Sequence, residues 1–137
     1  IVLSGQGGAL AKLLPFFRAG LGGRIGDGQQ LMSWITLSDL VQAYIFVFED
    51  TAVSGALNAV APDPSTNTSF TQTLGNALGR PTIFPIPRIL LKVLYGEMGK
   101  ETALADLGVQ PARLKELGFE WAQSDLRAAL RATIRNK

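Results

Sequence analysis

The side chains that most often carry acid–base or nucleophilic chemistry are missing from this sequence. It contains no histidine and no cysteine. A Ser-His-Asp triad, an imidazole proton shuttle, a thiolate nucleophile and a zinc–thiolate site are therefore all excluded. Acid–base chemistry within the chain would have to come from Asp, Glu, Lys or Tyr.

A tyrosine with a lysine four residues later can act as an acid or base, because the lysine charge lowers the tyrosine pKa. Neither tyrosine of this chain has such a partner. Tyr44 is followed four residues later by Phe48. Tyr95 is followed at that spacing by Gly99, and Lys100 comes one position too late. Both tyrosines lie on apolar helical faces, which predicts that they pack in the core.

The carboxylates also fall into structural patterns. Ser38 and Asp39 stand at the start of an apolar helical repeat, where such residues are typical N-caps. Glu49 and Asp50 fall where that repeat ends. The sequence therefore predicts no catalytic set and no metal site within this chain.

The glycine-rich segment 20–28 matches a dinucleotide-binding pattern in its spacing, with glycines at positions 20, 22 and 26. That pattern binds a pyrophosphate only when a strand precedes it and a helix N-terminus follows it. In this chain a helix is predicted before the segment and a strand after it. We therefore reject phosphate binding and predict an ordinary loop.

The elements that would position these residues follow from hydrophobic periodicity and from turn residues. In chain order we predict a strand at 1–3, a helix at 8–19, a strand at 31–36, a helix at 39–49, a strand at 56–60, a helix at 67–78 capped by Asn67 or Thr68, and helices around 89–98, 111–118 and 124–134. This alternation favours an α/β fold followed by a small, mostly helical C-terminal part.

The composition limits the class of protein. With 137 residues, the chain has the length of one ordinary domain. Hydrophobic residues make up 47% and charged residues 18%, which excludes a disordered chain. The net charge of +2 comes without a basic run, so we expect no nucleic-acid partner. The longest wholly apolar run, at 43–48, is far shorter than the ~20 residues of a membrane span, so we expect no membrane partner.

The first residues suggest that the sequence continues upstream. The chain opens with Ile1 inside an apolar strand-like run, whereas domains usually begin in an exposed polar tail. No positively charged leader precedes this run, so we predict no signal peptide and a cytoplasmic location.

Several ordered motifs give the sequence a family resemblance. In the first half they are Gly7-Gly-Ala-Leu-Ala-Lys-Leu-Leu-Pro15, Gly20-Leu-Gly-Gly23, Met32-Ser-Trp-Ile35 and Ser38-Asp-Leu-Val41. Further along they are Asn58-Ala-Val-Ala-Pro62, Gly79-Arg-Pro81, Gly96-Glu-Met98 and Leu117-Gly-Phe119. With these motifs, the chain resembles the C-terminal half of an atypical extended short-chain dehydrogenase/reductase of the "epimerase family protein" group.

The resemblance implies a fold and a cofactor. Residues 1–84 would be the substrate-side part of a Rossmann-type NAD(P)-binding epimerase domain, and residues 85–137 the small helical C-terminal domain of the group. Proteins of this group are about twice as long, and their glycine fingerprint and catalytic Tyr/Lys pair lie in the N-terminal half. NADP or NAD would therefore be bound mainly by that half, and Ser4 would approach the cofactor from this chain.

The resemblance also implies a substrate side, formed by Gln6, Gln30, Met32 and Trp34. Met32 stands where similar epimerases carry an arginine that holds a nucleotide-sugar diphosphate. A thioether cannot make that charge-assisted contact, so a less charged small molecule is expected in place of a UDP-sugar.

Two functions remain open from the resemblance. The first is an NAD(P)-dependent oxidoreductase or epimerase that is inactive without its N-terminal half. The second is a non-catalytic regulatory or binding protein of the same fold, because some members have been labelled cell-division-inhibitor homologues. A homodimer is expected as a possible assembly, and the plastid stroma is the alternative location.

Overall fold

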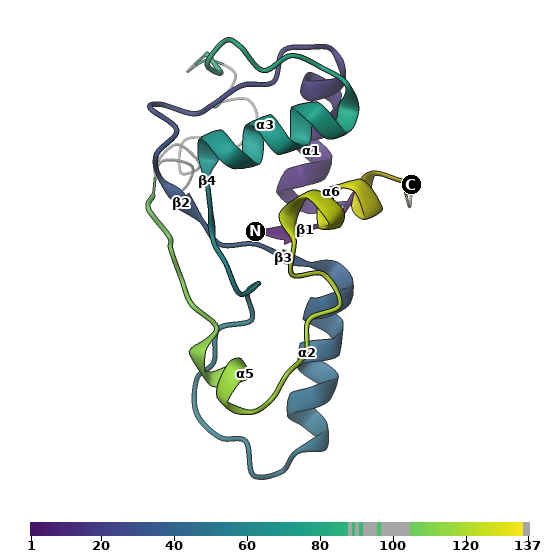
Figure 1. Ribbon diagram of the computed structural model, residues 1–137, viewed down its shortest axis with the longest axis vertical. Coiled ribbons are helices and arrows are strands. Elements are labelled where there is room, and N and C mark those ends of the chain that lie inside the picture. Colours follow the sequence, from purple (N-terminus) through teal and green to yellow (C-terminus); the bar gives the residue numbers. More distant parts are fainter. Residues whose placement is uncertain (88, 90, 92–95, 97–104, 136–137) are drawn as a thin grey trace.

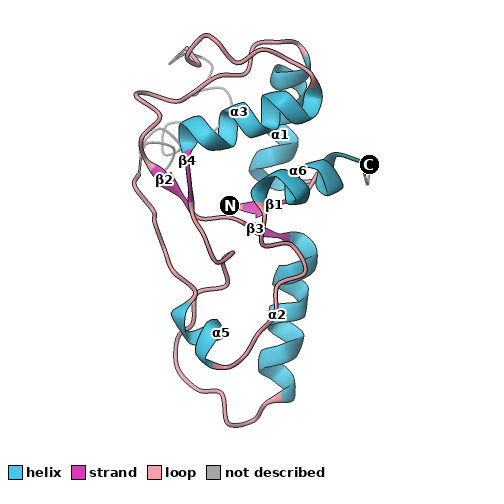
Figure 2. Ribbon diagram, in the orientation of Figure 1, coloured by secondary structure: helices cyan, strands magenta, loops and turns pink. Residues whose placement is uncertain are grey.

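The computed structural model describes residues 1–87, 89, 91, 96 and 105–135 (Figures 1 and 2). The predicted helix at 89–98 lies largely outside these residues, and so does Tyr95. The described elements are, in chain order, β1 (Val2–Leu3), α1 (Gly8–Arg18), β2 (Leu31–Met32), β3 (Ile35–Thr36), α2 (Leu37–Glu49), β4 (Ser65–Thr66), α3 (Asn67–Leu78), α5 (Ala112–Glu116) and α6 (Leu126–Arg135). The chain is a mixed α/β structure, as the sequence predicts.

Two short strands, β1 and β3, form a parallel pair in the middle of the folded molecule (Figure 1). In the register of β1 and β3, Val2 pairs with Ile35 and Leu3 with Thr36. The backbone N–H of Ile35 donates to the carbonyl of Ile1 over 2.9 Å. Because the strands are parallel, both end at the same edge, where β1 leads toward α1 and β3 leads directly into α2.

The predicted strand at 31–36 is divided into β2 and β3. Met32 in β2 pairs with Ser65 in the antiparallel strand β4 and bridges to Leu107. Ile35 in β3 instead pairs with β1. The segment changes partner at Ser33 and Trp34, and this change interrupts one apolar run into two short strands.

The strand predicted at 56–60 does not form. This segment has no regular secondary structure. The Val60 carbonyl accepts a hydrogen bond from the Trp121 indole over 3.0 Å, and Ala61 N–H donates to the Trp34 carbonyl over 2.6 Å. The Val60 carbonyl and the neighbouring Ala61 N–H therefore bond to an indole side chain and to Trp34, and not to a strand ladder.

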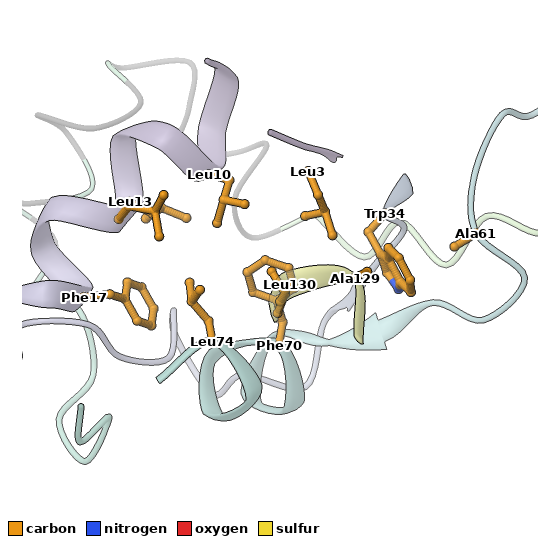
Figure 3. Packing of buried hydrophobic residues seen from close by; sticks show 11 residues of the cluster. Leu3, Leu10, Leu13, Phe17, Trp34, Ala61, Phe70, Leu74, Ala129 and Leu130 are labelled. Atoms are coloured by element: carbon orange, nitrogen blue, oxygen red, sulfur yellow. The ribbon is translucent and has the colours of Figure 1, made fainter. Parts of the chain in front are cut away.

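The main hydrophobic core lies among α1, α3, α6 and β1. Its members come from both ends of the chain and are Leu3, Leu10, Leu13, Leu14, Phe17, Trp34, Ala61, Phe70, Leu74, Ala129 and Leu130 (Figure 3). Because α6 contributes two of these residues, the C-terminal segment packs into the same core as residues 1–84. The domain boundary that we placed after residue 84 stays a prediction.

The helix caps differ in part from the prediction. The N-cap of α2 is Thr36, whose Oγ1 accepts from Asp39 N–H over 3.1 Å, so Ser38 and Asp39 lie inside the first turn. Likewise, Thr66 caps α3, one residue before the predicted Asn67. At the other end of α3, Gly79 has φ 63°, a left-handed conformation that glycine adopts readily and that matches the predicted end.

A second, smaller cluster connects α2 with the segment around α5. Ala43, Leu114 and Phe119 are buried in it. The rings of Phe119 and Trp121 meet edge to face at a centroid distance of 5.0 Å. Figure 1 shows α5 beside the part of α2 that extends away from the main core.

The apolar face of α2 is exposed, which corrects our prediction that Tyr44 packs in the core. Tyr44 is 60% exposed, and Phe48 is 81% exposed. Val41 and Ile45 lie on the same stripe and are 47% and 42% exposed. The described structure covers the opposite side of α2, where Ala43 is buried. We call Val41, Tyr44, Ile45 and Phe48 the α2 stripe.

Candidate functional site

The largest of the described cavities lies where β1 and β3 end. It has a volume of about 570 Å³. Its lining comes from β1 and the turn after it, from the start of α2, and from the C-terminal segment: Leu3, Ser4, Gly5, Gln6, Thr36, Leu37, Ser38, Val41, Gln42, Gln123, Ala129, Ala132 and Thr133. In open α/β sheets, ligands bind in the crevice at the carboxyl ends of the parallel strands. We therefore call this the strand-end cavity and treat it as the candidate site.

Ser4 and Gln6 enter the strand-end cavity from the turn between β1 and α1. Ser4 directly follows Leu3, which is buried and anchors the end of β1 in the core. The Ser4 hydroxyl oxygen accepts from the Gln6 N–H over 3.3 Å, which holds the turn that carries both side chains. The structure thus places the predicted cofactor residue and one predicted substrate residue in the same cavity.

The end of β3 supplies the second group of polar side chains. The hydroxyls of Thr36 and Ser38 are hydrogen bonded to each other at 3.0 Å. Gln42 lies one helical turn further along α2 and also lines the cavity. These hydroxyl and amide groups can donate and accept hydrogen bonds without carrying charge.

The C-terminal segment closes another side of the strand-end cavity. Gln123 precedes α6, and Ala132 and Thr133 lie on it. The backbone of α6 comes so close to the turn after β1 that a Cβ placed on Gly5 would lie 3.1 Å from the Thr133 carbonyl oxygen. The segments on the two sides of the cavity are thus more than 100 residues apart in the sequence.

Asp39 lies behind this arrangement and is only 1% exposed. Its carboxylate accepts from the Thr36 hydroxyl over 3.0 Å. It also accepts from the backbone N–H groups of Ala122 over 2.9 Å and Gln123 over 3.1 Å. The carboxylate therefore joins the start of α2 to the segment that leads into α6.

The lining of the strand-end cavity is neutral, because its side chains are apolar, hydroxyl or amide groups.

The remaining predicted substrate residues lie elsewhere. Gln30 lines a second cavity, of about 430 Å³, beside Asp27 and Asp106, and its Nε2 donates to the Ile25 carbonyl over 3.1 Å. Trp34 is 1% exposed in the main core, where its Nε1 donates to the Asp63 carbonyl over 3.1 Å.

Trp34 also borders a third cavity, of about 300 Å³, near Asp63 and Asp125.

Met32 is half-buried and lines none of these three cavities. Its sulfur accepts a hydrogen bond from Asn67 Nδ2 over 3.3 Å. The structure thus separates Gln30, Met32 and Trp34 from Ser4 and Gln6. The substrate roles of all these residues stay predictions.

Several residues of the strand-end cavity were not predicted from the sequence. Thr36 is the last residue of a predicted strand and Ser38 follows that strand, and this position alone could have indicated them. Gln123 and Thr133 have no local signal, because their place in the cavity depends on how α6 packs against β1.

Two general findings apply to the part of the chain that the structure describes. In residues 1–87 and 105–135, no three Asp or Glu side chains come together in a way that could hold a metal ion. Among the described helices, none is both long enough and apolar enough to cross a membrane.

Comparisons with known proteins identify the fold. Residues 86–133 match the model of a domain of unknown function, DUF1731. The chain is 41% identical over 134 residues to the chloroplastic epimerase family protein SDR39U1 homolog of Arabidopsis thaliana, covering 98% of this chain and 38% of that protein. It therefore spans less than half the length of this relative.

Two solved structures extend the likeness to three dimensions. The crystal structure of human epimerase family protein SDR39U1 with NADPH matches all of this chain and 46% of that one, with a TM-score of 0.91 and 37% identity. A nucleoside-diphosphate sugar epimerase from Corynebacterium glutamicum matches 95% of this chain and 24% of that one, with a TM-score of 0.71 and 32% identity.

The fold thus defines the class, which is that of the epimerase-like short-chain dehydrogenases/reductases. Within this class the chain corresponds in sequence and fold to the C-terminal part of the epimerase family proteins. These comparisons confirm the resemblance and support a nicotinamide cofactor. They do not favour the regulatory alternative.

Proposed function

We propose that this chain forms the nicotinamide- and substrate-facing side of an NAD(P)-dependent, epimerase- or dehydratase-like oxidoreductase. One observation carries the proposal. The predicted cofactor residue Ser4 and the predicted substrate residue Gln6 line one cavity at the carboxyl ends of two parallel strands. This is the position at which α/β sheets of this kind bind their ligands.

In this proposal, cofactor binding and ligand positioning are divided between this chain and the part of the protein outside residues 1–137. The cofactor supplies the hydride chemistry when bound. In our proposal the pyrophosphate is held by a glycine-rich turn outside residues 1–137, because the segment 20–28 lacks the strand–turn–helix context. Ser4 and Gln6 bind and orient the ligands.

For the cofactor we propose NADPH. The support is the human relative, whose crystal structure is described as containing NADPH. Ser4 is the residue of this chain that we place beside the nicotinamide, since it directly follows β1.

For the substrate we propose a small, neutral molecule. A volume of about 570 Å³ lies within the usual range of small-molecule sites, ~300–1,000 Å³. The neutral lining offers hydrogen bonds from Ser38, Gln42 and Gln123 but no counter-charge for a diphosphate.

The proposal is tested by NADPH binding to a protein of the relatives' full length that carries this chain as its C-terminal part. NADPH fluorescence is titrated with the wild type and with Ser4→Leu, which fills the cavity beside β1. Ser54→Leu is the matched control, because Ser54 is exposed and lies away from the three cavities. We expect at least tenfold weaker binding for Ser4→Leu only, and equal affinities would overturn the proposal.

For the location we keep the cytoplasm, with the plastid stroma as the alternative. The Arabidopsis relative is described as chloroplastic, which supports the alternative.

A further inference from the structure

We propose that the C-terminal segment matched by the domain of unknown function serves as a wall of the strand-end cavity, and that Asp39 is the positioning residue that holds this wall in place. The proposal rests on the proposed function of the cavity. It assigns a role to residues 119–133, for which the family description gives none.

The wall is attached at its beginning by Asp39. Two consecutive backbone N–H groups, of Ala122 and Gln123, converge on this single carboxylate, one on each oxygen. Charge-assisted hydrogen bonds of this kind are about twice as strong as neutral ones, and a carboxylate that is 1% exposed needs such partners. Gln123 thereby has its backbone fixed at the place from which its side chain enters the cavity.

The wall is attached again along α6. Asp125 caps the start of this helix locally, accepting from Ala128 N–H over 2.8 Å, and the attachment to the rest of the fold follows it. One turn later Ala129 and Leu130 are completely buried in the main core. Gly5 then allows the Thr133 carbonyl to approach the turn after β1. Residues on the cavity side of α6, including Ala132 and Thr133, are held opposite Ser4 by these contacts.

A simple helix-capping role would not explain the contacts of Asp39. Thr36 is already the N-cap of α2, and the capping hydrogen bond uses the Asp39 backbone N–H. The Asp39 carboxylate is instead directed to the distant backbone amides, 83 and 84 positions later in the sequence. The same side chain thus connects the end of β3 with the C-terminal wall.

The first test compares backbone amide hydrogen exchange in the wild-type chain, in Asp39→Asn and in Asp125→Asn. The Asp39→Asn side chain keeps one acceptor oxygen but turns an NH₂ group toward the second amide. We expect at least tenfold faster exchange at Ala122 and Gln123 and along α6, about 1.4 kcal/mol, with α3 unchanged. The matched control Asp125→Asn affects only the first turn of α6. Faster exchange confined to the first turn of α2 would overturn the proposal.

A second variant decides the question if Asp39→Asn does not fold. Ala122→Pro removes one of the two N–H donors at an exposed loop residue and leaves the Asp39 charge in place. We expect faster exchange at Gln123 and along α6 again, and unchanged exchange there would overturn the proposal.

A final measurement separates the wall from the function of the cavity. In a protein of the relatives' full length, NADPH should slow amide hydrogen exchange at residues 4–6 and 122–133. Asp39→Asn should reduce this protection, whereas Asp125→Asn should preserve it. If NADPH protects residues 4–6 equally in all three proteins, the cofactor site stands and the positioning role fails. If Asp39→Asn loosens the wall but NADPH protects neither region, the wall stands and the proposed function fails.

Discussion

Helices α1 and α2 have the same apolar spacing and opposite surroundings. On α1 the stripe of Leu10, Leu13, Leu14 and Phe17 is between 0% and 6% exposed. The corresponding α2 stripe is between 42% and 81% exposed. Figure 1 shows the reason: α1 lies among β1, α3 and α6, whereas α2 extends away from them and is covered on its other side by the segment around α5.

Helical periodicity therefore predicts that a helix has an apolar face, but not which elements cover that face. An exposed stripe of this kind usually marks a contact surface. Ile1 and Val2, at 40% and 37% exposed, add apolar surface at β1, whose described partner is β3 alone. A parallel strand with an open edge is a template for association. The apolar side chains around α1 are therefore buried within the chain, whereas those of the α2 stripe and of the start of β1 are exposed.

The largest expected effect comes from truncating the covered helix. Leu10→Ala removes a completely buried side chain from the main core and should lower the free energy of unfolding by about 2–5 kcal/mol. Ile45→Ala removes a side chain of similar size from the α2 stripe and should change the free energy of unfolding by less than ~0.5 kcal/mol. Urea unfolding followed by circular dichroism measures both. Similar losses for the two variants would mean that α2 is covered in solution.

The next expected effect concerns association of the isolated chain. We expect sedimentation velocity to show self-association that grows with concentration, because the α2 stripe is available for contact. A charge in the stripe, as in Ile45→Lys, should weaken association at least tenfold. Gln72→Lys, on an exposed position of α3, is the matched control and should leave association unchanged. A strictly monomeric wild-type chain at all concentrations would contradict this prediction.

A smaller effect is expected from the cap of α2. Thr36→Ala removes the side chain that accepts from Asp39 N–H and should cost about 1 kcal/mol of stability. Because α2 buries little of its apolar stripe, we expect the loss to appear as fraying of α2, measured by amide exchange at residues 37–42. Uniform loosening of α1 and α2 together would show that the two helices are more tightly coupled than their packing indicates.

The smallest effect is a gain at the start of α1. Gly7 is the N-cap of this helix and has an extended backbone that any residue adopts, with no atom within 4 Å of an added Cβ. Gly7→Ser should supply a capping oxygen and stabilise the chain by a few tenths of a kcal/mol. Thermal melts of the two proteins side by side measure the gain, and a loss would mean that Gly7 is needed for the turn that carries Gln6.

Local sequence signals determined the elements whose causes lie within a few residues. The apolar spacing of residues 10–17 is sufficient to specify α1, Gly79 ends α3 in the left-handed conformation, and Asp125 caps α6, because each of these patterns acts through neighbours on the same turn. The resemblance singled out Ser4 and Gln6, which follow the first strand and line one cavity. Their binding roles stay predictions.

Contacts between residues that are distant in the sequence depend on the path of the folded chain. The division of residues 31–36 follows from pairing with β4 on one side and β1 on the other, and the exposure of Tyr44 follows from which elements surround α2. The same is true of Asp39, whose hydrogen bonds reach residues 122 and 123. A carboxylate at a helix start looks the same in the sequence whether it caps its own helix or binds a distant backbone, because the partner is selected by the path of the folded chain.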